Sequence, residues 1–171
     1  MDFIKKIEEK LAALFKGLPD LKDGSREALV GAWPWIALVF GILQLFAAWA
    51  LWGLVRAAES ILGEYSRYYV NYPEALSGAE KFVIYLGIVV LLVDAVILLM
   101  AYPELKKRAR RGWELLFLGA LLNVAYSFVS LFIHERGFGS FLFSLLGSAV
   151  GFYLLFQVRG KYGSVKASKK E

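Results

Sequence analysis

Four apolar runs constrain this chain more than any other feature of its sequence. Each run has the roughly 17–25 residues that a helix needs to cross a bilayer. We expect each one to be helical, because lipid offers no partner for unpaired backbone groups. The sequence therefore predicts an all-α polytopic membrane protein with a four-helix transmembrane bundle over residues 33–158. The four predicted spans are residues 33–55, 82–102, 113–133 and 138–158.

The overall composition supports a membrane protein over a soluble one. Hydrophobic residues make up 58% of the 171 residues, and the mean hydropathy is +0.55. A soluble domain is typically about 45–50% apolar. The alternative is a soluble bundle of unusually apolar helices, but a soluble helix needs a polar face, and these runs lack a charged one.

Residues 1–18 form a separate amphipathic element. Their apolar residues recur at helical spacing, opposite a face of mixed lysine and glutamate. This helix is too polar to span a bilayer, so we expect it to lie in the headgroup plane. Its lysines would then face anionic lipid, whereas the alternative is a helix that docks on a partner protein. The lysines predicted to contact lipid are Lys5, Lys6 and Lys10.

Residues 19–32 are predicted to be a cytoplasmic linker that ends in a short helix before the first span. Pro34 follows directly. It fits the first turn of a helix, where its missing N–H costs nothing. Otherwise Pro34 kinks a longer helix.

Basic residues are concentrated in three places: the N-terminal segment, the link between spans two and three, and a tail at residues 159–171. Cytoplasmic loops carry the excess of lysine and arginine. This distribution predicts cytoplasmic N- and C-termini in what we expect to be a bacterial plasma membrane. The link also predicts contacts with anionic lipid, through Lys106, Lys107, Arg108, Arg110 and Arg111.

Polar residues inside the spans fall at one depth. At about 1.5 Å per helical residue, Asp94 lies roughly 12 Å above the basic ends of the spans. Asn123, Gln44 and Ser148 each lie roughly 15 Å above those ends, on three other helices. Small residues share the same helix faces, and such stripes mark close helix contacts in membranes. We therefore expect a buried polar layer of Asp94, Asn123, Gln44 and Ser148, with Tyr126 as a further candidate.

Asp94 permits two interpretations. A carboxylate in the middle of a span costs about 2.5–3.5 kcal/mol on insertion scales, and such residues often mark proton or ion pathways. The alternative is a structural hydrogen bond between helices, which contributes about 0.6 kcal/mol. The spans contain no second charged residue that could pair with Asp94.

Several chemistries find no support in the sequence. The chain has no cysteine and one histidine, His134, so disulfides, thiolate catalysis and multi-histidine metal sites are excluded. No catalytic motif or phosphate-binding loop is present. We expect no enzyme activity, no cofactor, no metal and no nucleic-acid partner.

The segments "RRGWELLFLGALLN" and "GFYLLFQVRGKY" resemble those of uncharacterised small four-span bacterial membrane proteins. The resemblance covers spans three and four and implies no activity. The sequence most favours a small non-catalytic interaction or accessory subunit, which would be a homo-oligomer or bind another membrane protein. The alternative is an oligomeric transporter or channel for ions, protons or small molecules that uses the Asp94 layer.

Overall fold

The computed structural model describes residues 2–68, 78–133 and 138–163, and all regular structure in these ranges is helical. α1 covers Asp2–Phe15, α2 Asp23–Tyr68, α3 Gly78–Lys106, α4 Arg110–Ile133 and α5 Phe138–Val158, and a short 3₁₀ helix, η1, covers Arg159–Lys161. The helices α2 to α5 are each long and apolar enough to cross a membrane. His134 and residues 164–171 of the predicted basic tail lie outside the described residues.

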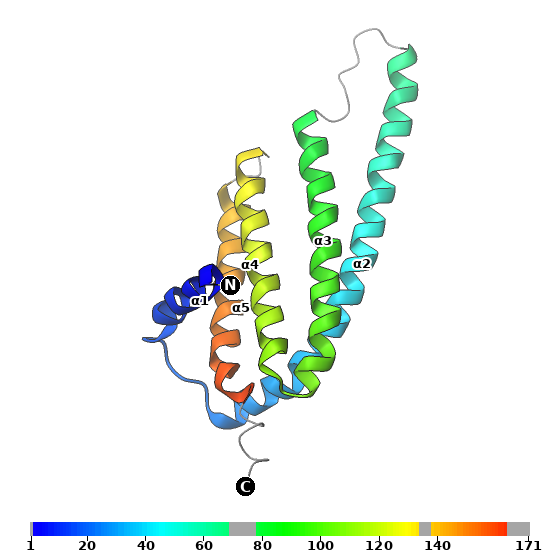
Figure 1. Cartoon of the computed structure of the whole chain (residues 1–171). Helices are drawn as coiled ribbons and strands as arrows, with labels where there is room; N and C mark the ends of the chain where they lie inside the picture. Colours follow the sequence, from blue (N-terminus) through cyan, green and yellow to red (C-terminus); the bar gives the residue numbers. More distant parts are fainter. Residues whose placement is uncertain (1, 69–77, 134–137, 164–171) are drawn as a thin grey trace.

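The four long helices pack in chain order (Figure 1). α2 packs along α3, α3 along α4, and α4 along α5, whereas α2 and α5 touch over a much smaller area. α2 therefore rises away from α5 instead of closing the bundle. We refer to the lower end in Figure 1 as the basic end; it contains the start of α2, the α3–α4 connection and η1.

The first long helix differs from the sequence prediction. The short helix expected within residues 19–32 and the span expected at 33–55 form one 46-residue helix, with Pro34 inside it. The buried positions of this helix explain its continuity. Val30, Pro34, Ala37, Gly41, Ala48 and Val55 recur at helical spacing and form one buried face across the proline. Packing on both sides of Pro34 therefore holds the helix together although the proline removes one backbone hydrogen bond.

The core of the molecule lies at the basic end. Trp113 is fully buried, and its Nε1–H donates a 2.7 Å hydrogen bond to the carbonyl oxygen of Leu155. Its ring stacks on Phe117 at a centroid distance of 5.3 Å. The core cluster comprises Val30, Ala37, Ala101, Leu105, Trp113, Leu116, Phe117, Phe152, Leu155, Val158 and Tyr162.

Tyr162 closes this core from below. It is 4% exposed, and its hydroxyl makes no hydrogen bond within the described residues. Burial is the main cause that raises the pKa of Tyr162 to about 12. The charge of Arg108 lowers this pKa, and the charge of Glu27 raises it. Tyr162 is therefore neutral at physiological pH, and its ring acts as an apolar lid on the core.

The α3–α4 connection is a tight turn that depends on a glycine. Arg108 has a φ of 51°, and its N–H donates to the carbonyl oxygen of Leu105. A Cβ at Gly112 would lie 2.7 Å from the backbone nitrogen of Leu105. Since that neighbour is backbone and cannot move aside, the first turn of α4 approaches the end of α3 this closely only with glycine at position 112.

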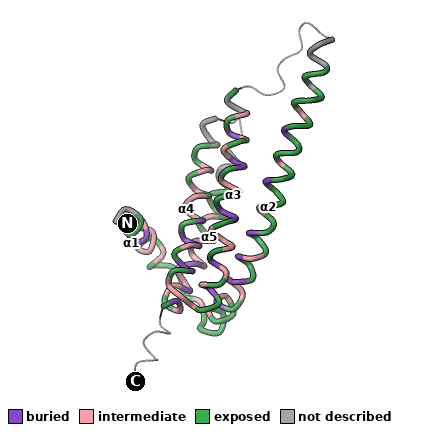
Figure 2. The backbone as a smooth tube through the Cα atoms, turned by 45° about the vertical axis from the view of Figure 1, so that its right-hand side comes forward, coloured by how far each residue is buried: buried purple, intermediate pink, exposed green. Residues whose placement is uncertain are grey.

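The outer surfaces of the long helices are apolar and exposed. Figure 2 shows most of the backbone as exposed or half-buried, with buried segments recurring along α2. Trp49 on α2 and Phe143 on α5 are each 79% exposed. Soluble monomers rarely expose continuous apolar surface of this extent, so these surfaces need a cover other than water.

α1 docks on the basic end of its own chain. Ile7, Leu11 and Phe15 pack against the core, and Phe15 stacks on Phe156 at 5.6 Å. Glu8 is 8% exposed; it accepts a 2.5 Å hydrogen bond from Arg110 Nη2 and forms an ion pair with Arg159 Nη2 at 2.6 Å. The described structure thus shows α1 packed on the bundle through part of its apolar face. Two other large apolar residues of α1, Ile4 and Leu14, are exposed.

We predict that Glu8→Gln loosens α1. The substitution removes the charge from a hydrogen bond worth about 1.5–3 kcal/mol and from the ion pair with Arg159. The loss should fall near the lower end of that range, because Arg110 and Arg159 are about a third exposed. Trypsin should then cut the full-length variant faster at Lys16 and Lys22, in the segment that joins α1 to α2.

Glu9→Gln is the matched control. Glu9 is exposed and makes no ion pair within the described residues. It carries the same charge one position along the same helix. Because that charge has no partner to lose, Glu9→Gln should leave the rate of trypsin cutting unchanged. Equal cutting of the two variants would show that the Glu8 ion pairs do not hold α1 in place.

Candidate functional site

Asp94 lies in the interior of the bundle and joins three helices. It is on α3 and 3% exposed. Its Oδ2 accepts a 2.7 Å hydrogen bond from Gln44 Nε2 on α2 and a 2.8 Å hydrogen bond from Asn123 Nδ2 on α4. The Asn123 amide also donates to the carbonyl oxygen of Gly119 at 3.0 Å. One carboxylate oxygen therefore receives a hydrogen bond from each neighbouring helix.

Glycine makes room for this carboxylate. A Cβ at Gly119 would lie 2.5 Å from Asp94 Oδ1. On the other side, a Cβ at Gly41 of α2 would lie 3.1 Å from the side chain of Leu99. Small residues at these two positions let α2 and α4 approach α3 closely, as is typical of helix contacts in membranes. Gly119 thus belongs to the site although it has no functional group of its own.

The site has more acceptors than donors. Asp94 Oδ1 and Gln44 Oε1 are both buried, and neither has a hydrogen-bond partner within the described residues. Leaving a buried acceptor unpaired costs about 1–3 kcal/mol, more for a charged group. The arrangement is therefore complementary to a group that brings hydrogen-bond donors.

Two of the predicted layer residues lie elsewhere. Ser148 on α5 is half-buried and makes no hydrogen bond within the described part of the chain. Tyr126 packs against α3, where a Cβ at Gly87 would lie 2.5 Å from its hydroxyl. The structure therefore brings Gln44, Asp94 and Asn123 together, but not Ser148 or Tyr126. α5 is linked to α4 instead by Ser127 and Ser144, whose hydroxyl oxygens are 2.8 Å apart.

A groove of about 480 Å³ runs beside the polar layer, where α2 and α5 diverge. Its walls are mostly apolar, and a Cβ at either Gly147 or Gly151 of α5 would meet nothing within 4 Å. The indole N–H of Trp33, near the basic end of the groove, is buried and unpaired within the described residues. The lining residues are Trp33, Ile36, Ala37, Phe40, Gln44, Asp94, Leu98, Leu116, Gly119, Ala120, Asn123, Gly147, Gly151 and Leu155.

The basic residues predicted to contact lipid have varied surroundings. Arg108 pairs with Glu27, and Arg110 pairs with Glu8 and Glu114. Lys107 pairs with Glu104, and the ammonium of Lys106 lies over the rings of Trp35 and Tyr102. Lys5, Lys6, Lys10 and Arg111 are exposed and make no ion pair within the described residues, and Lys106 and Lys107 are exposed as well. Lipid contact stays a prediction for all eight residues.

Sequence reasoning missed Glu8 as a structural residue. Its position carries a signal, because Glu8 lies four residues after Ile4 and three before Leu11, on the apolar face of α1. A carboxylate on such a face needs a cationic partner. Arg110 and Arg159 supply it from two distant parts of the chain.

The described residues contain no cluster of three or more metal-ligating side chains. No protein-family model, curated protein or solved structure matches the chain. The interpretation of the site therefore rests on its geometry.

We predict opposite effects from two substitutions of Asp94. Asp94→Leu leaves the amides of Gln44 and Asn123 without their acceptor, so the free energy of unfolding should fall by about 1 kcal/mol. Asp94→Asn keeps one acceptor oxygen and removes the charge, so stability should hold or rise. Thermal melting in an uncharged detergent measures both changes.

Val93→Leu is the control, because Val93 is the exposed neighbour of Asp94 on the same helix. It should melt like the wild type. If Asp94→Leu also melts like the wild type, the three-residue hydrogen-bonded layer does not stabilise the bundle.

Proposed function

We propose that this chain is an integral membrane protein and serves as a non-catalytic interaction subunit. Its groove between α2 and α5 would receive a transmembrane helix of a second protein. Membrane insertion is supported by the four long apolar helices and by their exposed apolar surfaces. One observation supports the subunit role. An open apolar groove borders Asp94, a buried acid with an unpaired oxygen.

The shape of the groove suits a helix. Gly147 and Gly151 are four residues apart on α5, and neither is covered by another side chain. Small residues at this spacing let the backbone of a second helix approach closely. The groove lies along the long helices, so an inserted segment would run parallel to them.

Charge complementarity favours a different protein as the partner. The unpaired atoms beside Asp94 and Gln44 are acceptors, so the incoming helix should carry a donor such as lysine, arginine or an amide. The four spans of this chain contain no lysine or arginine at the depth of Asp94. A second copy could therefore not supply a cation to the site.

A designed peptide tests this function. We would reconstitute the full-length protein in zwitterionic vesicles with a fluorescent leucine-based transmembrane peptide that carries one central lysine. Energy transfer from a dye at Ser60→Cys reports association, and the comparison peptide has leucine in place of lysine. The lysine peptide should bind the wild type about fivefold more tightly than the leucine peptide, as expected for an interhelical contact of about 1 kcal/mol.

Two variants separate groove binding from nonspecific association. Asp94→Asn should abolish the preference for lysine while leaving the leucine peptide unaffected. Gly147→Leu fills the groove and should weaken the binding of both peptides. Equal binding of the two peptides to the wild type would contradict the proposal, as would a homo-oligomer in detergent that buries Gly147.

A second candidate function is transport, and it is favoured by the unpaired Oδ1 of Asp94 at the groove. In that case an oligomer of this chain would pass protons or cations through the Asp94 layer. Proteoliposomes would then show a proton or cation flux that Asp94→Asn abolishes while the fold survives. Absence of flux in the wild type would leave the interaction subunit as the better account.

We further propose that the basic end faces the cytoplasm of a bacterial cell. The excess of lysine and arginine at this end supports the orientation. The chain has no cysteine, so single cysteines at Ser25, near the basic end, and Ser60, near the far end, report accessibility cleanly. A membrane-impermeant thiol reagent added outside cells should label Ser60→Cys and spare Ser25→Cys; the reverse pattern would invert the topology.

A further inference from the structure

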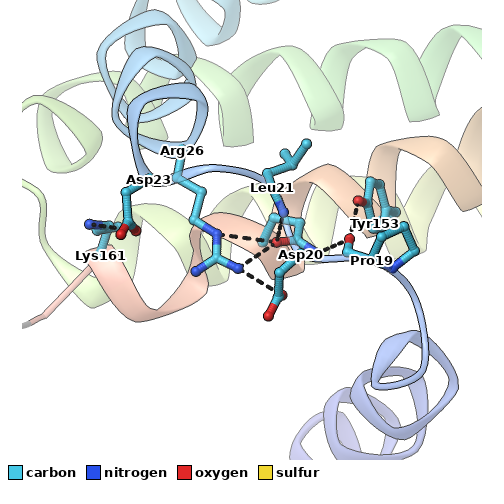
Figure 3. A network of polar contacts seen from close by, with 8 residues as sticks. Pro19, Asp20, Leu21, Asp23, Arg26, Tyr153 and Lys161 are labelled. Atoms are coloured by element: carbon cyan, nitrogen blue, oxygen red, sulfur yellow. Dashed lines mark hydrogen bonds and ion pairs between the residues drawn. The ribbon is translucent and has the colours of Figure 1, made fainter.

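A second cavity lies at the basic end, away from the groove. It has a volume of about 580 Å³ and is bounded by α1, the start of α2, the end of α5 and η1. Figure 3 shows the polar contacts that surround it. The lining residues are Ala12, Phe15, Lys16, Asp20, Asp23, Arg26, Phe156, Gln157, Arg159, Gly160 and Lys161. We call this cavity the basic cleft.

The linker that forms one wall of the cleft is pinned to α5. Gln157 Oε1 accepts hydrogen bonds from the Leu21 backbone N–H at 3.2 Å and from Arg26 Nη2 at 2.9 Å. The hydroxyl of Tyr153 donates to the Pro19 carbonyl oxygen at 2.6 Å. Since these contacts join residues more than 130 positions apart, the cleft is part of the fold and has a defined shape.

The cleft carries more positive than negative charge. Its lining includes four cationic side chains, those of Lys16, Arg26, Arg159 and Lys161, and two carboxylates; Glu8, which pairs with Arg159, adds a third carboxylate. The carboxylates of Asp20 and Asp23 are 82% and 85% exposed. Ion pairs with such exposed partners are worth about 0–1 kcal/mol, so a stronger anion can replace them.

Arg26 and Lys16 are the best placed to bind an anion. Arg26 uses Nε and Nη2 for Gln157 and Asp20, and its Nη1 has no hydrogen bond within the described residues. Lys16 is exposed and makes no ion pair there. A guanidinium with a free N–H and an ammonium that line one cavity can both bind phosphate oxygens.

Part of the cleft wall is apolar. Phe15 and Phe156 stack there at 5.6 Å, beside Ala12. α5, which carries Phe156, continues from this wall as one of the membrane-length helices. The cleft therefore matches a ligand with an anionic head and apolar chains, whereas free phosphate would leave the aromatic wall unused.

We propose that the basic cleft binds an anionic phospholipid, with its phosphate between Lys16 and Arg26 and its acyl chains beside Phe15 and Phe156. The phosphate replaces Asp20 as the partner of Arg26, and Arg159 and Lys161 add favourable charge nearby. The site is distinct from the surface lysines of α1 and from the α3–α4 link. It rests on the proposed membrane insertion but is independent of any partner at the α2–α5 groove.

Calorimetric titration of the full-length protein in an uncharged detergent tests the site. The titrants are dioctanoylphosphatidylglycerol, dioctanoylphosphatidylcholine and sodium phosphate at constant ionic strength. Phosphatidylglycerol should bind at one site, and the other two titrants at least about fivefold more weakly. In Lys16→Gln and Arg26→Gln, phosphatidylglycerol should bind about fivefold more weakly, since a basic residue near a membrane surface contributes about 1 kcal/mol.

Lys22→Gln is the matched control, because Lys22 lies in the same linker and does not line the cleft. It loses the same charge and should bind phosphatidylglycerol like the wild type. Lys16→Gln decides the outcome if Arg26→Gln does not fold, since Lys16 takes no part in the Gln157 network. Three outcomes would overturn the proposal: equal binding of the two lipids, equally tight binding of inorganic phosphate, or equal weakening by Lys16→Gln and Lys22→Gln.

Discussion

The hydrogen bond from the Trp113 indole to the Leu155 carbonyl oxygen, at 2.7 Å, ties α4 to α5 in the centre of the basic end. The same ring carries the guanidinium of Arg110 on its face at 4.3 Å, and that of Arg159 at 5.7 Å. Cation–π contacts of this kind orient an arginine as well as attracting it. Both arginines also pair with Glu8 of α1. Trp113 therefore helps to position α1 through these two arginines.

The packing of the helices changes along the length of the molecule. Below Asp94, four helices and α1 enclose a core of aromatic and branched side chains. At Asp94 the bundle still has three helices in contact through hydrogen bonds. Beside it, α2 and α5 no longer meet, and the groove begins. The buried acid thus lies where a closed bundle gives way to an open one, which is where an added helix would find both apolar walls and an unsatisfied polar group.

Depth along a helix could be predicted from the sequence, because it requires only a count of residues at a fixed rise. This count placed Gln44, Asp94 and Asn123 at one level, and the structure places their side chains in contact. Rotation about the helix axis is set by packing, and the small residues of α5 occupy more than one face. Gly147 and Gly151 line the groove, whereas Ser148 does not.

Two features of the fold could not be derived from local patterns. The continuation of α2 through Pro34 depends on a buried face that spans both sides of the proline. The docking of α1 depends on Glu8, whose partners Arg110 and Arg159 are more than a hundred residues away. In both cases the deciding contacts exist only once the chain has folded.

The length of α2 has a mechanical consequence. Its 46 residues extend about 69 Å, whereas a bilayer with its headgroups is about 40–45 Å thick. Figure 1 shows its upper turns rising above the other helices. A rod of this length would act as a lever if it pivoted near Pro34. A tilt of about 10° there would displace the far end by about 9 Å, so a small rearrangement at the groove would be magnified into a large movement at the far end of α2.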